Sequence, residues 1–251
     1  MADRSAIEWT NATWNPVTGC TKVSPGCAHC YAESFAERFR GVTGHPYEQG
    51  FELRLWQERL ELPLRWRQPR LIFVNSMSDL FQPDVPEDFI RSVFETMKRA
   101  HWHHFQVLTK RPERVVALAD KLHWGENVWM GTSIENRRWV DRANQLRRIP
   151  ATVRFISAEP LLGPLDGLDL SDIDWLIVGG ESGRHHRPIK LEWVQQLKRL
   201  CLEQKVRFFF KQWGGIRPKS GGRLLEGEEW SQMPAVLDDV APIPGRVVAL
   251  A

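Results

Sequence analysis

Three of the four cysteines in the sequence lie within one short stretch. Cys20, Cys27 and Cys30 are spaced C-x6-C-x2-C, and the pair Pro25-Gly26 favours a turn between the first cysteine and the second. Thiolates are soft ligands that suit zinc or iron–sulfur clusters, and three of them so close together have little use outside metal binding. The spacing therefore indicates a metal centre.

A helical pattern begins directly after this loop. From Ala28 onward the apolar residues Tyr31, Phe35 and Phe39 recur at helical spacing. We therefore expect Cys27 and Cys30 near a helix N-terminus, where free N–H groups and the helix dipole favour the thiolate over the thiol.

Two kinds of metal centre fit the spacing. A structural zinc needs a closed tetrahedral shell, and its fourth ligand would be His29 or the distant Cys201. An iron–sulfur cluster can be held by three cysteines with one iron left open. The spacing alone does not decide between them. Cys201 shares an apolar helix face with Val194 and Leu197, which indicates core packing instead of metal binding.

Apolar runs alternate with helical patterns along most of the chain. The sequence has 251 residues, of which 42% are hydrophobic and 26% charged, as in an ordinary soluble globular protein. Alternation of strands and helices predicts parallel βαβ units. Besides a short strand before Cys20, the predicted strands are 71–74, 105–108, 127–130, 153–156, 174–178 and 206–210.

This count predicts an α/β fold, a partial (βα)6–7 TIM-like barrel, with a doubly wound open sheet as the alternative. Residues 41–68 are predicted as an irregular connection containing one short helix. We expect one domain over residues 1–251, in which the Gly- and Pro-rich residues 213–251 form a C-terminal segment that covers the barrel.

Polar and glycine residues follow each predicted strand. In parallel barrels the chemistry gathers at these ends. The segments are Asn75-Ser76-Met77-Ser78-Asp79, Thr109-Lys110-Arg111-Pro112, Gly131-Thr132-Ser133-Ile134-Glu135-Asn136, Ser157-Ala158-Glu159-Pro160, Gly179-Gly180-Glu181-Ser182-Gly183 and Lys211-Gln212-Trp213-Gly214-Gly215. For any single residue the alternative is a helix cap or an ordered turn, but all the strand ends carry such residues together.

Charge and hydropathy limit the partners. Lys and Arg number 34 against 31 Asp and Glu, a net charge of +3 that does not by itself imply nucleic acid. The sequence shows no signal-peptide pattern and no apolar run near the ~20 residues of a membrane span, so we expect a cytoplasmic protein without membrane contact.

A cysteine triplet after a first strand, followed by a barrel with polar strand ends, resembles the radical S-adenosylmethionine (SAM) enzymes. The resemblance implies a 4Fe–4S cluster on Cys20, Cys27 and Cys30, whose open iron takes the amino and carboxylate groups of SAM. It also implies reductive cleavage of SAM to a 5′-deoxyadenosyl radical, which abstracts hydrogen from substrate in lyase- or transferase-type chemistry. An electron donor such as flavodoxin or ferredoxin is implied as a partner.

Within that superfamily the strand ends look most like those of spore photoproduct lyase. The likeness implies that Ser76 or Ser78, Lys110 and Ser133 contact SAM, with Lys110 serving as a point charge for its carboxylate. His29 or Tyr31 would cover the adenine. Glu159 and Glu181 would contact the ribose or the substrate.

Three longer sequence segments resemble those of a family of phage and bacterial proteins, a family for which no substrate is established. They are Cys27-Ala28-His29-Cys30-Tyr31-Ala32-Glu33, Leu108-Thr109-Lys110-Arg111-Pro112 and Gly179-Gly180-Glu181-Ser182-Gly183. This likeness runs from Trp14 to Pro234.

The chain departs from the usual radical SAM pattern in its cysteine loop and in one glycine motif. The usual spacing is C-x3-C-x2-C, and His29 stands where an aromatic residue normally precedes the last cysteine. Gly179-Gly180-Glu181 follows a later strand than the usual Gly-Gly-Glu. A zinc site, and a barrel that binds a cluster without cleaving SAM, therefore stay open.

Basic residues after several strands indicate DNA or RNA as a candidate substrate, for lesion repair or modification. The alternatives are a non-catalytic, zinc- or cluster-stabilised barrel that binds nucleic acid, and a metal-dependent nuclease that uses Asp79, Glu159 and Glu181.

Overall fold

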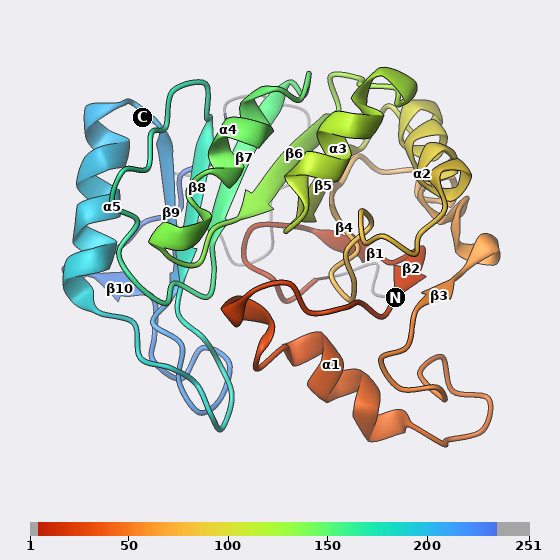
Figure 1. The fold of residues 1–251 in the computed structure, drawn as a ribbon, viewed down its shortest axis with the longest axis horizontal. Coiled ribbons are helices and arrows are strands. Elements are labelled where there is room, and N and C mark those ends of the chain that lie inside the picture. The colour runs from red at the N-terminus through yellow and green to blue at the C-terminus, as the bar shows by residue number, and fades with distance from the viewer. Residues whose placement is uncertain (1–4, 235–251) are drawn as a thin grey trace.

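A computed structural model describes residues 5–234 of the chain. A parallel sheet of seven strands dominates it, in the order β1-β4-β5-β6-β7-β8-β9 (Figure 1). The strands are β1 (Ala12–Trp14), β4 (Leu71–Val74), β5 (His104–Thr109), β6 (Val128–Ser133), β7 (Val153–Ala158), β8 (Trp175–Gly179) and β9 (Arg207–Gln212). The predicted partial (βα) barrel is confirmed, since each strand pairs in parallel with the next strand of the series.

Four helices pack along the outer face of this sheet. They are α2 (Glu87–Arg99), α3 (Pro112–Leu118), α4 (Arg142–Arg147) and α5 (Leu191–Glu203). Alternate strand residues such as Ile72 and Val74 join the apolar faces of these helices in one core. Cys201 is fully buried there, as predicted, and burial raises the pKa of its thiol to about 12.

The inner face of the curved sheet is filled with aromatic side chains. A second core forms here from the strand residues whose side chains point to the face opposite Ile72 and Val74, among them Phe73, Trp129, Phe155 and Trp175. Trp9, from the segment before β1, packs into this core with its ring centroid 4.6 Å from that of Phe73. Side chains therefore fill the interior of the half-barrel, and space for a ligand remains beyond the carboxyl ends of the strands.

The free edge of the last strand is covered by the chain that follows it. The amide of Phe210 donates to the carbonyl of Trp230, and Ser231 lies opposite Phe209 in an antiparallel bridge. Covering an edge in this way blocks pairing with another chain. Residues 230–232 thus pair with β9, whereas 235–251 of the predicted covering segment lie outside the described residues.

Short elements complete the structure. The strand β2 (Val17–Thr18) pairs with β3 (Arg54–Leu55), and β10 (Leu224–Leu225) pairs with β11 (Glu228–Glu229); the sequence patterns did not predict these pairs. The connection 41–68 contains two 3-10 helices, Gln57–Arg59 and Leu62–Arg65, where one short helix was expected. Among the residues that the structure describes, no helix is long and apolar enough to span a membrane.

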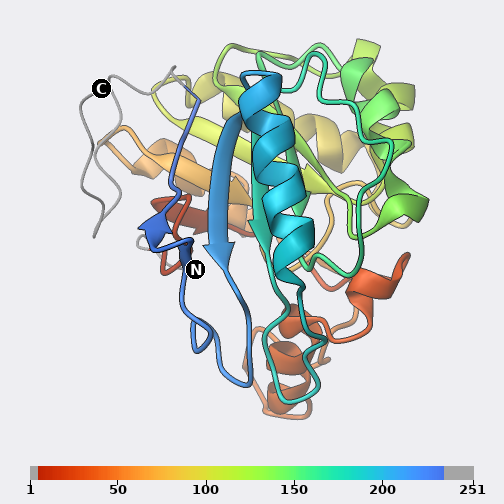
Figure 2. The same ribbon diagram turned by 90° about the vertical axis from the view of Figure 1, so that its left-hand side faces the viewer.

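The helix α1 (Tyr31–Ala36) lies apart from the other helices, beyond the carboxyl ends of the strands. In Figure 2 the arrow of β9 points toward the end of the molecule that holds α1 and the loop after β8. The cysteine loop, which leads into α1, is therefore carried to the edge of the sheet where the polar strand ends lie.

Candidate metal and cofactor site

A cavity of about 460 Å³ opens at the carboxyl edge of the sheet. Its walls come from the cysteine loop, the strand ends and the segment that contains Trp9. Each site residue predicted from the sequence lines it: Cys20, Cys27, His29, Cys30, Tyr31, Ser76, Ser78, Lys110, Ser133, Glu159 and Glu181. The fold thus brings Cys20 and Glu181, which are 161 positions apart in the sequence, to the wall of the same cavity.

The three cysteines are unpaired and partly exposed. Within residues 5–234, no three histidine, cysteine or carboxylate side chains are gathered closely enough to hold a single metal ion. The donor set still fits a cluster, because three soft thiol ligands border one cavity and a cluster spreads its thiolates over different irons.

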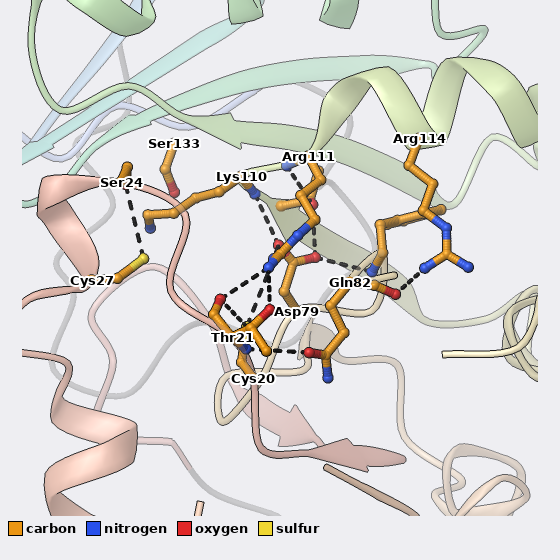
Figure 3. A network of polar contacts seen from close by, with 12 residues as sticks. Cys20, Thr21, Ser24, Cys27, Asp79, Gln82, Lys110, Arg111, Arg114 and Ser133 are labelled. Atoms are coloured by element: carbon orange, nitrogen blue, oxygen red, sulfur yellow. Dashed lines mark hydrogen bonds and ion pairs between the residues drawn. The ribbon is translucent and has the colours of Figure 1, made fainter. Parts of the chain in front are cut away.

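Polar contacts fix the backbone on both sides of Cys20 (Figure 3). The Gln82 amide donates to the carbonyl of Gly19 at 3.0 Å, and its oxygen accepts from the Thr21 N–H at 3.2 Å. Gly19 has φ +80°, and a Cβ there would lie 2.1 Å from the carbonyl oxygen of Glu52, so only glycine fits. The position of Cys20 is therefore set before any ligand binds.

Arg111 joins this segment to Asp79. Its Nη2 donates to the carbonyl and hydroxyl oxygens of Thr21 at 2.9 and 2.8 Å, and its Nη1 donates to Asp79 Oδ2 at 2.8 Å. The same Nη1 lies 3.7 Å from Cys20 Sγ. Asp79 also accepts from the Thr109 hydroxyl at 2.7 Å and from the amides of Phe81 and Lys110 at 3.0 and 3.1 Å.

Burial dominates the acidity of two of the thiols. It raises the pKa of Cys20 to about 11, helped by the charge of Asp79 and opposed by Arg111. Burial also raises the pKa of Cys30, although the N–H groups of Ala32 and Glu33 at the start of α1 lower it. Burial outweighs the start of α1, which favours the Cys30 thiolate as expected, so the pKa of Cys30 is raised overall. Ligation by a metal would itself deprotonate the thiol.

Glu135, two positions after the end of β6, holds the middle of the cysteine loop. The carboxylate is fully buried and accepts from the Ser24 hydroxyl at 2.5 Å and from Arg142 Nη1 at 3.1 Å. Lys110 Nζ lies 3.7 Å from Glu135 Oε1, the oxygen that also accepts from Ser24. A Cβ at Gly26 would lie 2.6 Å from Glu135, so glycine permits this close approach.

Glu181, after β8, holds the end of the loop. It accepts from the Arg187 backbone N–H at 2.9 Å and its Nε at 2.8 Å, and it lies 3.2 Å from His29 Nδ1. Arg187 Nη2 in turn donates to the Pro25 carbonyl at 3.0 Å. Burial raises the pKa of Glu181, but the hydrogen bonds from Arg187 and His29 outweigh it and the pKa is lowered.

Other cavity residues have partners of their own. Lys211 Nζ lies 2.6 Å from Glu159 Oε1. The Tyr31 hydroxyl donates to the Ser76 carbonyl, while its ring stays largely exposed. Ser78 Oγ donates to the Val17 carbonyl at 2.9 Å. Ser133 is buried beside Lys110 at the cavity wall, as Figure 3 shows.

The structure also brings in residues that sequence reasoning did not single out as site residues. Arg111, Glu135 and Lys211 belong to segments that directly follow predicted strands, whereas Arg187 and Arg142 lie further along the chain after such segments. Proximity to the predicted strand ends was the one sequence feature that could have indicated these residues. It does not predict which basic side chain pairs with which carboxylate.

The carboxylates proposed for a nuclease are separately neutralised. Asp79 pairs with Arg111, Glu159 with Lys211 and Glu181 with Arg187. A nuclease site would need these oxygens together on a metal ion. The geometry therefore does not favour that hypothesis.

The parallel sheet, its outer helices and a cavity at its carboxyl edge define a partial (βα) barrel with a site where such barrels carry chemistry. The sequence profile of the family described as "Protein of unknown function (DUF5131)" matches residues 4–234, and the chain belongs to this family. A comparison with curated proteins finds no match.

Similar solved structures include several of spore photoproduct lyase. A cysteine-to-alanine mutant is 13% identical, with 78% of this chain and 74% of that one covered and a TM-score of 0.48. A cysteine-to-serine mutant is 16% identical, with coverages of 78% and 61% and a TM-score of 0.46. A double mutant with bound AdoMet and dinucleoside spore photoproduct is 16% identical, with coverages of 66% and 55% and a TM-score of 0.45. This chain thus spans just over half of that last structure.

Proposed function

We propose that this protein is an iron–sulfur enzyme of the radical SAM type, with Cys20, Cys27 and Cys30 as cluster ligands. The observation that carries the proposal is that three thiols on one loop and the polar ends of several parallel strands border a single cavity. Its volume of about 460 Å³ falls in the ordinary range for small-molecule and cofactor sites. When bound, the cluster would supply the electron for reductive cleavage of SAM to a 5′-deoxyadenosyl radical.

The protein's own task would be to position and shield the reactants. Asp79, Glu135 and Glu181 hold the ligand loop through Arg111, Ser24 and Arg187 respectively. The aromatic core below the cavity closes its floor with Trp9 and Phe73, which limits the approach of water from that side. The absorption and EPR spectra of anaerobically purified protein, recorded with and without SAM, test the proposal. A spectrum without iron–sulfur features would contradict it.

Lys110 is the proposed contact for the SAM carboxylate. Its ammonium group lies at the cavity wall, is only 21% exposed, and is not fully engaged by Glu135 at 3.7 Å. A charge-assisted hydrogen bond contributes roughly 1.5–3 kcal/mol. We therefore expect Lys110→Ala to weaken SAM binding by about 10- to 100-fold in equilibrium binding assays while the cluster is retained.

The matched control is Lys121→Ala, which removes an exposed lysine that pairs with Glu87 on the outer face. It should leave SAM affinity unchanged. Equal affinities for the Lys110 variant and the wild-type protein would exclude this role for Lys110.

A nucleic acid, undergoing lesion repair or base modification, is the substrate class that we propose. Several basic residues that follow the strand ends are already committed to internal partners, as Arg111 and Arg187 are. Others remain exposed at the same edge: Arg137, Arg138, Arg184 and Arg217. Exposed arginines can meet phosphates, because the planar guanidinium group donates two parallel hydrogen bonds to phosphate oxygens.

If Arg184 meets one phosphate, Arg184→Ala should flatten the log–log salt dependence of oligonucleotide binding. The expected change in slope is about 0.9 on duplex DNA and about 0.7 on a single strand. Titrations at several salt concentrations measure it. Arg91→Ala, on the outer helix α2, is the control and should not change the slope. No binding at low salt by protein that holds its cluster would exclude a nucleic-acid substrate.

A further inference from the structure

The guanidinium group of Arg111 is placed unusually close to a proposed ligand sulfur. It is buried at 5% exposure, although arginine is seldom buried without a partner. One of its nitrogens lies 3.7 Å from Cys20 Sγ and 2.8 Å from Asp79 Oδ2, while the other binds Thr21 (Figure 3). The group is therefore shared between a carboxylate and a thiol.

Asp79 fixes the direction of this contact. Its two oxygens accept from the Thr109 hydroxyl and from the amides of Phe81 and Lys110 in addition to Arg111, so the carboxylate cannot turn without losing these bonds. Arg111 is held from the other side by the two oxygens of Thr21. Both ends of the arginine are thus constrained, and its N–H group is aimed at the sulfur.

Hydrogen bonds to cysteine sulfur, and charges close to it, are two of the means by which a protein sets the reduction potential of an iron–sulfur cluster. A positive charge and an N–H donor stabilise the reduced cluster, which carries one more electron. A carboxylate behind the arginine offsets part of that effect. Residues that hydrogen-bond to the coordinating side chains also fix the orientation of those side chains.

We propose that Arg111 is a positioning residue that orients Cys20 and raises the reduction potential of the cluster, and that Asp79 sets the strength of this effect. This inference rests on the proposed function, because it needs a cluster on Cys20. It concerns a residue outside the strand-end set assigned to SAM, and its measurement requires neither SAM nor substrate.

The test is a potentiometric titration of the cluster, monitored by EPR, in the wild-type protein, two single variants, their double variant and one control variant. Arg111→Met removes both the charge and the donor, and we expect a shift to a more negative potential. Asp79→Asn removes the opposing charge and one of the two accepting oxygens, while Thr21 still holds the arginine, and we expect a shift to a more positive potential. The double variant should lie between the two single variants. A purely structural role would not give shifts of opposite sign.

Arg187→Met is the matched control, because its hydrogen bonds go to Glu181 and to the Pro25 carbonyl and not to a sulfur. Its shift should be smaller than that of Arg111→Met. Should Arg111→Met fail to fold, Asp79→Asn decides, and an unchanged or more negative potential there overturns the inference.

The spectrum of the wild-type protein distinguishes failure of the proposed function from failure of the inference about Arg111 alone. Wild-type protein without a cluster would overturn the proposed function together with this inference. A wild-type cluster whose potential is the same in the Arg111→Met variant would overturn the inference alone.

Discussion

Replacing Cys20, Cys27 or Cys30 by alanine, one at a time, is expected to abolish the iron–sulfur cluster of anaerobically prepared protein. Each thiol borders the same cavity, and the described residues place no further cysteine there. A cluster held by only three protein ligands has no substitute when one is removed. Iron and sulfide analysis should fall from about four atoms of each per chain to near zero, with loss of the visible absorption.

Cys201→Ala is the control for this series. Its sulfur is buried between α5 and the sheet, among apolar side chains and away from the cavity. The variant should keep its full iron content. One tightly bound zinc and no iron in reconstituted wild-type protein would instead identify a structural metal and exclude the radical SAM proposal.

Replacing Glu135 by alanine is expected to cost about 3–5 kcal/mol of stability, because removing one partner of a buried ion pair leaves the other charge uncompensated. Glu135 is fully buried, and the side chain of Arg142 beside it is only 7% exposed. The loss should be measured as the free energy of urea-induced unfolding of the metal-free protein.

The control is Glu61→Ala, which breaks the ion pair with Arg99. Both partners are at least half exposed, and such pairs contribute about 1 kcal/mol or less. If both variants lost the same stability, the buried pair would not hold the loop as described. Glu135→Gln should fall between them, because it loses the charge but keeps one oxygen that can accept from Arg142.

The sheet was predictable from the sequence because its strands are buried on both faces. Leu71–Val74 is a continuous apolar run and matches β4 to the residue, since outer helices cover one face and aromatic rings fill the other. The short pair β2 and β3 was missed because two-residue strands have no readable period. Their pairing depends on neighbours that the sequence does not reveal.

The sequence allowed us to predict which residues line the cavity, but not which of their side chains pair with one another. Parallel strands end on one edge, so polar residues after them had to meet, and Lys110, Ser133 and Glu181 line one cavity. Which cation meets which carboxylate depends on side-chain direction and separation at that edge. Glu181 lines the cavity as expected from its strand end, but its pairing with Arg187 and His29 could not be predicted.

The anchors of the cysteine loop also have a consequence for the order of folding. Thr21 is held by a residue 90 positions later, Ser24 by one 111 positions later and Pro25 by one 162 positions later. Contacts of such long sequence separation form late, because the intervening chain must close first. During synthesis the cysteines emerge early, yet the last of these anchors cannot form before Arg187 has emerged and β8 is paired. Insertion of a cluster into a shaped site would therefore follow folding of the barrel and would not nucleate it.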